Sequence, residues 1–195
     1  MIFMAVLPIY TYGTSVLRKK AVKITEITDG LITLVKDMFE TMHASSGIGL
    51  AANQVGSLLR VLVVDISDME GYEEQKPLVI LNPEILIQNG SSEMEEGCLS
   101  IPGLRNSVTR SEKISLRYYD INFHEKNIEA DGLLSRVILH EVDHLNGKLF
   151  IDHIPKEEYK KLLPLLQDME RGIIDADYPV VSAIDDKKKE KVRLL

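Results

Sequence analysis

The chain has 195 residues, of which 45% are hydrophobic and 27% are charged. This length supports one domain with a sizeable core that needs no disulfide staples. Because 23 basic and 30 acidic residues give a formal net charge of −7, the chain has no surplus of cations for general or sequence-specific nucleic-acid binding. The single cysteine, Cys98, excludes an intramolecular disulfide and an all-cysteine metal site within one chain.

The N-terminal residues 1–8 are apolar but do not form a secretory signal. No basic segment precedes them, and a polar stretch around Arg18 follows too soon for an apolar region of the usual length. No apolar run approaches the roughly 18 residues that cross a bilayer. Together with an unpaired thiol, these features predict a cytoplasmic protein that does not bind membranes.

The first predicted helix covers residues 29–44. Apolar side chains recur there every three or four positions from Ile32 to Met42. Thr28 stands just before this pattern, and threonine is a common N-terminal cap. Small and polar residues at 45–49 then end the helical pattern.

The next segments have the composition of strands. Residues 59–65 are rich in β-branched side chains and form a run too short for a buried helix, so a strand is the better interpretation. Residues 78–81 and 114–118 follow the same pattern. Between the first two of these strands, the polar residues 68–76 predict a surface loop.

Helical periodicity returns in the last third of the chain. A mostly apolar stripe predicts a helix over 133–146, because it stops at Asn146-Gly147, which is typical of a helix C-terminus. A further helical pattern over 156–170 contains Pro164, which we expect to kink or divide that helix.

The most informative motif is His140-Glu141-Val142-Asp143-His144 in the second of these helices. Residues four positions apart share a helix face, so both imidazoles can reach one metal ion at about 2.0–2.1 Å. Glu141 points about 100° away from His140, yet its side chain can reach a water on that ion. Two surface histidines are the alternative interpretation, but the apolar neighbours favour a buried helix.

A catalytic site of this kind needs a third protein ligand and an open position. One peptidase pattern supplies a third histidine, but Phe150 stands at that place. A downstream carboxylate is formally available from Glu157, Glu158 or Glu170. Cys98, followed closely by a Pro-Gly turn, could also be presented from a bend, although most free cysteines are buried hydrophobes. With the helix motif, a Cys-His-His site explains the pattern best.

Residues 47–56 form a segment of small or aliphatic side chains that also contains Asn53 and Gln54. Small side chains allow another backbone to approach closely, and an isolated glutamine can donate a hydrogen bond into a dry site. The segment lacks the Gly-Lys-Ser/Thr ending of a phosphate loop. A tightly packed helix start is the alternative interpretation.

Residues 47–54, 96–100 and 140–144 together resemble peptide deformylase, in the order and at the distances typical of that family. The resemblance covers about residues 5–165. It implies an α+β fold in which antiparallel β-sheets pack around a central helix carrying the His-Glu-x-x-His motif. It also implies removal of the formyl group from formylmethionine at the start of nascent polypeptides, with release of formate.

The resemblance assigns roles by position. The ligands of one divalent metal ion would be Cys98, His140 and His144. Glu141 would be the general acid/base, and Gln54 and the backbone N–H of Leu99 would stabilise the oxyanion. The family commonly uses Fe(II), which we expect in cells, and also works with zinc, nickel or cobalt, since a mixed sulfur and nitrogen site suits several metals.

Supporting roles also follow from the resemblance. Glu96 would pair with Arg110 and brace the segment around Cys98, although two ordinary surface charges would look the same in sequence. Arg105 would lie near the bound peptide. The pocket for the methionine side chain would be lined by Ile48, Gly49, Gly97, Leu133 and Val137. For Leu133 and Val137, plain core packing explains the same residue types.

Three further histidines and Asp143 receive no catalytic role. Asp143 is expected on the helix surface or behind the ligands, because further carboxylates would overfill a four-coordinate site. The histidines without a partner pattern are His43, His124 and His153.

We expect a single catalytic domain over residues 1–175 and a charged, flexible C-terminal tail over 176–195. The tail could dock on the ribosome near the exit tunnel, although a solvated terminus fits its charge run better. Two other functions stay open. One is a metallopeptidase with a downstream glutamate ligand, and the other is a non-enzymatic module stapled by a closed metal site, in which Glu141 would have no task.

Overall fold

The protein is an α+β molecule, and its computed structural model describes residues 5–187. The largest sheet is antiparallel, in the order β2 (Gly49–Ala51), β3 (Val61–Val64), β4 (Leu78–Asn89), β7 (Lys113–Tyr119) and β8 (Glu125–Asp131). A second antiparallel sheet is the hairpin of β5 (Ser92–Cys98) and β6 (Ile101–Arg110). A short parallel pair joins β1 (Ile9–Tyr10) to β9 (Val180–Val181).

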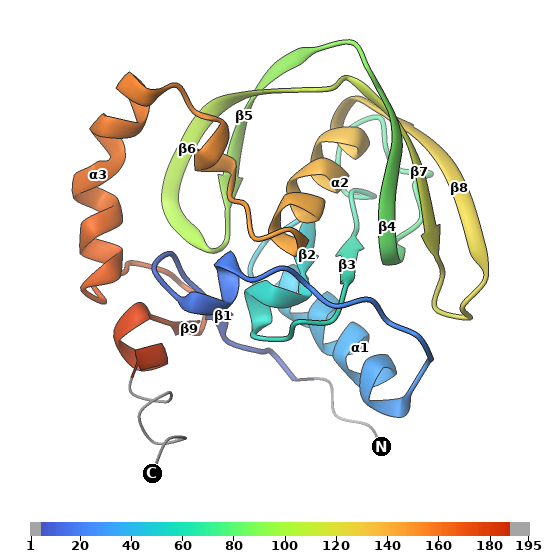
Figure 1. The fold of residues 1–195 in the computed structure, drawn as a ribbon, viewed down its shortest axis with the longest axis horizontal. Coiled ribbons are helices and arrows are strands. Elements are labelled where there is room, and N and C mark those ends of the chain that lie inside the picture. Colours follow the sequence, from blue (N-terminus) through green and yellow to red (C-terminus); the bar gives the residue numbers. More distant parts are fainter. Residues whose placement is uncertain (1–4, 188–195) are drawn as a thin grey trace.

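Helix α2 (Gly132–Leu145) occupies the centre of the molecule. Figure 1 shows it between the β5–β6 hairpin on one side and strands β4, β7 and β8 on the other. Helix α1 (Asp29–Ala44) packs near β2 and β3, while α3 (Lys156–Glu170) stands beside the hairpin. Short 3₁₀ turns cover Ser15–Arg18, Ala52–Val55 and Phe150–His153. The architecture confirms the expected sheets around a central helix.

Helix α2 is unusual because it is buried and yet carries several polar side chains. Eleven of its 14 residues are buried, and the polar ones among them are Ser135, Arg136, His140, Glu141 and His144. A helix surrounded by other elements is normally apolar on all sides. Buried polar groups need partners inside the protein, so this helix marks the place where function should be sought.

The sequence predicts the helices more accurately than the strands. Helix 29–44 is confirmed, and Thr28 Oγ1 accepts a hydrogen bond from the Leu31 N–H at 3.2 Å, as expected of a cap. The helix expected at 133–146 covers Gly132–Leu145, so it begins and ends one residue earlier than expected. The strand expected at 78–81 instead continues to Asn89, because pairing with β7 carries it through two register shifts.

Of the two expected effects of Pro164, a kink or a division, the division does not occur, because helix α3 runs without a break through this residue. Pro164 is exposed, whereas Leu166 and Met169 are buried against the protein. Apolar packing of that face therefore outweighs the missing backbone hydrogen bond.

The C-terminal segment also differs from expectation. The sequence predicts a flexible tail from residue 176, but Val180–Val181 pairs with β1, and Val181, Ser182 and Ala183 are buried. Two-residue strands carry little sequence signal, which explains the difference. Residues 188–195, which hold much of the charge run, lie outside the described part of the chain.

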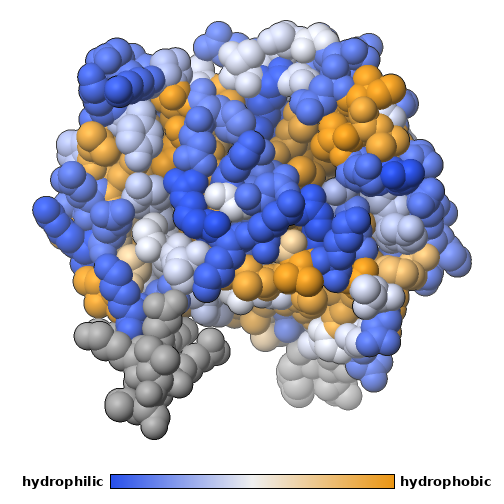
Figure 2. Space-filling model, viewed as in Figure 1, coloured by the Kyte–Doolittle hydropathy of each residue, from blue (hydrophilic) through white to orange (hydrophobic). Residues whose placement is uncertain are grey.

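The face of the molecule in Figure 2 is mainly hydrophilic, with apolar residues in separate patches. Within residues 5–187, no helix has the length and apolar character required to span a membrane.

Replacing Pro164 tests how much packing compensates for the proline. We expect Pro164→Ala to raise the free energy of unfolding by about 2 kcal/mol, because alanine restores an N–H donor and removes a steric clash inside the helix. The measurement is urea denaturation. Gln167→Ala, at another exposed position of α3, should change the value by less than about 0.5 kcal/mol. Equal values for both variants would contradict this account.

Candidate active site

Three donor atoms converge beside α2. The side chains of Cys98, His140 and His144 place one ligand atom each within 4.8 Å of one another. Cys98 ends β5 at a shift in the hairpin register, and its Sγ lies 3.2 Å from His144 Nε2. No other group of three such side chains in residues 5–187 is arranged this way. In particular, Glu157 and Glu158 instead pair with lysines on α3.

The donor set fits one transition-metal ion. His140 Nδ1 forms a hydrogen bond of 2.9 Å with Glu96 Oε2. The lone pair of the other ring nitrogen, Nε2, can therefore bind a metal ion. His144 Nδ1 is buried and has no partner among the residues described. One thiolate and two imidazoles suit zinc, Fe(II) and related divalent ions, and three protein ligands leave a position open for water or substrate.

A buried carboxylate orients His140. Glu96 Oε1 accepts from Arg110 Nε at 2.6 Å and from Arg136 Nη1 at 2.5 Å, while Oε2 accepts from Arg110 Nη2 at 3.0 Å. Burial alone would raise the pKa of Glu96, but the hydrogen bonds from His140 and Arg110 outweigh burial and lower it to about 2. The charged carboxylate therefore keeps a proton on His140 Nδ1 and fixes the ring.

The expected pair of Glu96 with Arg110 is thus present, and both side chains are at most 5% exposed. They are not ordinary surface charges. Arg110 Nη1 also donates to Asp143 Oδ2 at 2.7 Å, and His153 Nε2 lies 2.7 Å from the same oxygen. Asp143 is therefore behind the ligands rather than among them, and His153, which has no partner pattern in the sequence, completes the network.

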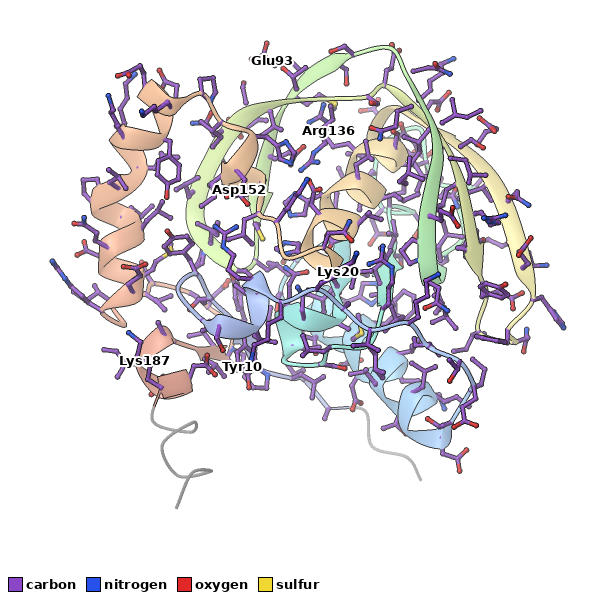
Figure 3. All side chains as sticks on the ribbon, viewed as in Figure 1. Tyr10, Lys20, Glu93, Arg136, Asp152 and Lys187 are labelled. Carbon is purple, nitrogen blue, oxygen red and sulfur yellow. The ribbon has the colours of Figure 1, made fainter. Side chains whose placement is uncertain are left out.

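Arg136 is the functional residue that the sequence analysis missed. In Figure 3 it lies between α2 and the hairpin. Besides Glu96, it donates to the Val108 carbonyl at 2.9 Å and the Ser92 carbonyl at 2.8 Å. A signal was available, because Arg136 stands four residues before His140 and therefore on the same helix face.

Glu141 and Gln54 face the same site from different elements. Glu141 is 4% exposed, and its Oε2 has no partner within the described chain. Burial raises its pKa to about 7. Gly49 leaves room for it, since a Cβ there would lie 2.7 Å from Glu141 Oε1. Gln54 Oε1 accepts from the Ala51 N–H at 2.8 Å, which turns its amide NH₂ toward Cys98 Sγ, 3.7 Å away.

A cavity of about 860 Å³ opens beside these groups. Glu96, Cys98, Leu99, His140, Glu141 and Gln54 reach it, whereas His144 lies beneath it, fully buried. All six residues expected to bind substrate also line it, namely Ile48, Gly49, Gly97, Arg105, Leu133 and Val137. Arg105 is at the rim, with a side chain 71% exposed. Residues 175–178 form part of the wall, and 176–178 of these belong to the segment expected to be a flexible tail.

A Cys-His-His donor set with both histidines buried, a buried glutamate on the helix that carries them and an adjoining cavity are the features of a mononuclear metallohydrolase. Comparison with known proteins makes this specific. The sequence model described as polypeptide deformylase matches residues 6–160. The chain belongs to the polypeptide deformylase family.

Similar proteins support this assignment. The peptide deformylase of Chlorobium luteolum is 45% identical over 175 residues, which are 90% of this chain and 92% of that protein. A crystal structure of a peptide deformylase from Legionella pneumophila is 38% identical, with a TM-score of 0.78 over 86% of this chain and 96% of that one. The Ehrlichia chaffeensis enzyme in complex with actinonin is 37% identical, with a TM-score of 0.78 and coverages of 87% and 98%.

Arg136 should contribute strongly to stability. Arg136→Met leaves a buried carboxylate with one cation fewer and removes the side-chain donor to two backbone carbonyls, so we expect a loss of about 3–5 kcal/mol in the free energy of unfolding. The matched control is Arg117→Met. Arg117 pairs with Glu84 on the surface, where the side chains are 41% and 56% exposed, and should cost less than about 1 kcal/mol. Urea denaturation compares the two, and similar losses would disprove the role of Arg136.

Proposed function

We propose that this protein is a peptide deformylase that removes the formyl group from the N-terminal formylmethionine of nascent polypeptides and releases formate. Membership of the family supports the reaction class. The observation that carries the proposal is the convergence of donor atoms from Cys98, His140 and His144 beside a cavity that Cys98, His140 and Glu141 line. The other residues described below support the same reaction.

Cys98, His140 and His144 would hold one divalent metal ion, Fe(II) in cells, with zinc, nickel or cobalt as possible substitutes. When bound, the ion polarises the formyl carbonyl and lowers the pKa of water toward neutrality. The thiolate of Cys98 reduces the charge of the site to +1, compared with +2 for three neutral histidines. Cys98 therefore lowers the Lewis acidity of the metal and makes the site sensitive to oxidation.

Glu141 moves the proton in this mechanism. Its Oε2 is buried and unpartnered among the described residues, and the side chain reaches the cavity. It would take a proton from the attacking water and pass it to the departing amine of methionine. The C–N bond then breaks, and formate and the free amino terminus leave.

Gln54 and Leu99 would stabilise the negative charge on the former carbonyl oxygen. The Gln54 NH₂ points toward Cys98, which supports this role. Loss of one such donor typically raises the barrier by about 2.7–4 kcal/mol. The methionine side chain would lie against Ile48, Leu133 and Val137, while Gly97, which has no side chain, allows a peptide backbone to approach.

The substrate explains the partners that we propose. Formylated nascent chains emerge at the ribosome in the cytoplasm, so the enzyme would work there, near the exit tunnel. Arg105 stands at the exposed rim of the cavity, where the rest of the peptide would leave the site. Its charge and length suit hydrogen bonds to peptide carbonyls.

The two alternatives lack this support. A metallopeptidase would need a downstream glutamate near the histidines, but Glu157 and Glu158 are 77% and 45% exposed and face lysines. A closed structural site would need a fourth donor, and the cluster within residues 5–187 has three. A closed structural metal site would also leave Glu141 without a function.

The direct test is an anaerobic assay of formate release from a formyl-Met peptide, with metal analysis of the same sample. We expect formate release and one metal ion per chain. Cys98→Ser should lose both metal and activity, while Glu170→Gln should keep both. The reverse result would favour a metallopeptidase. A fully loaded wild-type protein that releases no formate would disprove the proposed function.

Glu141→Gln separates the proton-transfer role from metal binding. We expect kcat to fall by about 10²–10⁴ with metal content unchanged, because the amide cannot accept the proton but keeps the shape of the side chain. Glu158→Gln, on the surface of α3, is the control and should match the wild type. If Glu141→Gln retained full turnover, another group would have to be the base.

A further inference from the structure

The C-terminal segment reaches the cavity through Tyr178. Residues 175–178 line the cavity, and the Tyr178 hydroxyl donates a hydrogen bond of 2.8 Å to the Leu99 carbonyl. Leu99 directly follows Cys98 in the chain. The contact therefore joins the C-terminal segment to the main chain beside the proposed metal ligand.

This segment is held firmly enough to act on Leu99. The Ile9 N–H donates to the Pro179 carbonyl at 2.8 Å, and the Thr11 N–H donates to the Val181 carbonyl at 3.1 Å. Val181 is 5% exposed. Because the hydrogen bonds begin at Pro179, the residue after Tyr178, the tyrosine has a fixed anchor.

The turn at Leu99 and Ser100 is held from two sides. The Tyr12 N–H donates to the Ser100 carbonyl at 2.8 Å, and Tyr178 holds the Leu99 carbonyl. The backbone has only two soft dihedral angles per residue. With Cys98 on one side and the Leu99 carbonyl held on the other, the rotation of the peptide that carries the Leu99 N–H is restricted.

We infer that Tyr178 is a positioning residue, which holds the Leu99 main chain so that its N–H faces the carbonyl oxygen of the substrate. This inference rests on the proposed function. Burial and the charge of Cys98 raise the pKa of Tyr178 to about 12, so its hydroxyl stays a donor at neutral pH. The catalytic unit then extends beyond residue 175, and the C-terminal segment is a working part of it.

Tyr178→Phe removes the hydroxyl and keeps the ring. We expect kcat to fall about five- to tenfold, the effect of one lost hydrogen bond, with KM within twofold. The fall should be equal for formyl-Met amide and for a formyl-Met tripeptide, since the defect lies at the formyl group. Tyr119→Phe is the matched control, because the Tyr119 hydroxyl donates to Glu125 on β8 and Tyr119 does not line the cavity. Its kcat and KM should equal those of the wild type.

A second readout does not depend on catalysis. Backbone amide exchange of residues 98–100, measured by NMR on the metal-free protein, should be faster in Tyr178→Phe than in the wild type or in Tyr119→Phe. Unchanged kcat and unchanged exchange would overturn the inference. A rise in KM for the tripeptide alone would also overturn the inference, because Tyr178 would then only contact the bound peptide. Failure of the wild type to release formate would instead count against the proposed function, while exchange would still test Tyr178.

Discussion

The structure depends on one buried carboxylate, Glu96, between Arg110, Arg136 and His140. A charge removed from water is tolerated only when its partners replace the lost hydration. The partners of Glu96 come from β6 and α2, while Glu96 itself is on β5. The ion pairs and hydrogen bonds of Glu96 therefore hold the hairpin against the central helix. This contact brings Cys98, two residues further on, close to the histidines. The same carboxylate orients the imidazole of His140, so stability and the proposed chemistry share one group.

This arrangement explains why a polar helix can lie in the middle of a protein. Arg110 continues the network to Asp143 and His153, so the charges around α2 form a connected set rather than isolated pairs. Such networks are stable when every member is satisfied. The unpartnered atoms in the described chain include Glu141 Oε2 and His144 Nδ1, and both belong to the proposed site. Within residues 5–187 these are two of five such atoms, and a third is Arg136 Nε in the Glu96 network.

The sequence predicts the parts that depend on local patterns. Helices 29–44 and 133–146 have apolar periodicity and clear ends, and the three motifs led to the site residues. Strand β5 was missed because the buried side chain in it is Glu96, so it has no apolar alternation to detect. The contact of Tyr178 with Leu99 joins residues 79 positions apart. No local pattern can indicate it, because only the folded chain creates it.

The parallel pairing of β1 and β9 joins the two ends of the described chain, with Thr11 and Val181 separated by 170 positions. Chains are synthesised from the N-terminus, and contacts between distant residues form late. β1 therefore has no partner until the chain has been made through residue 181. Until then the turn beside Cys98 lacks its hydrogen bond from Tyr178. An enzyme that is expected to process unfinished chains thus cannot complete its own site until its own chain has been made past residue 178.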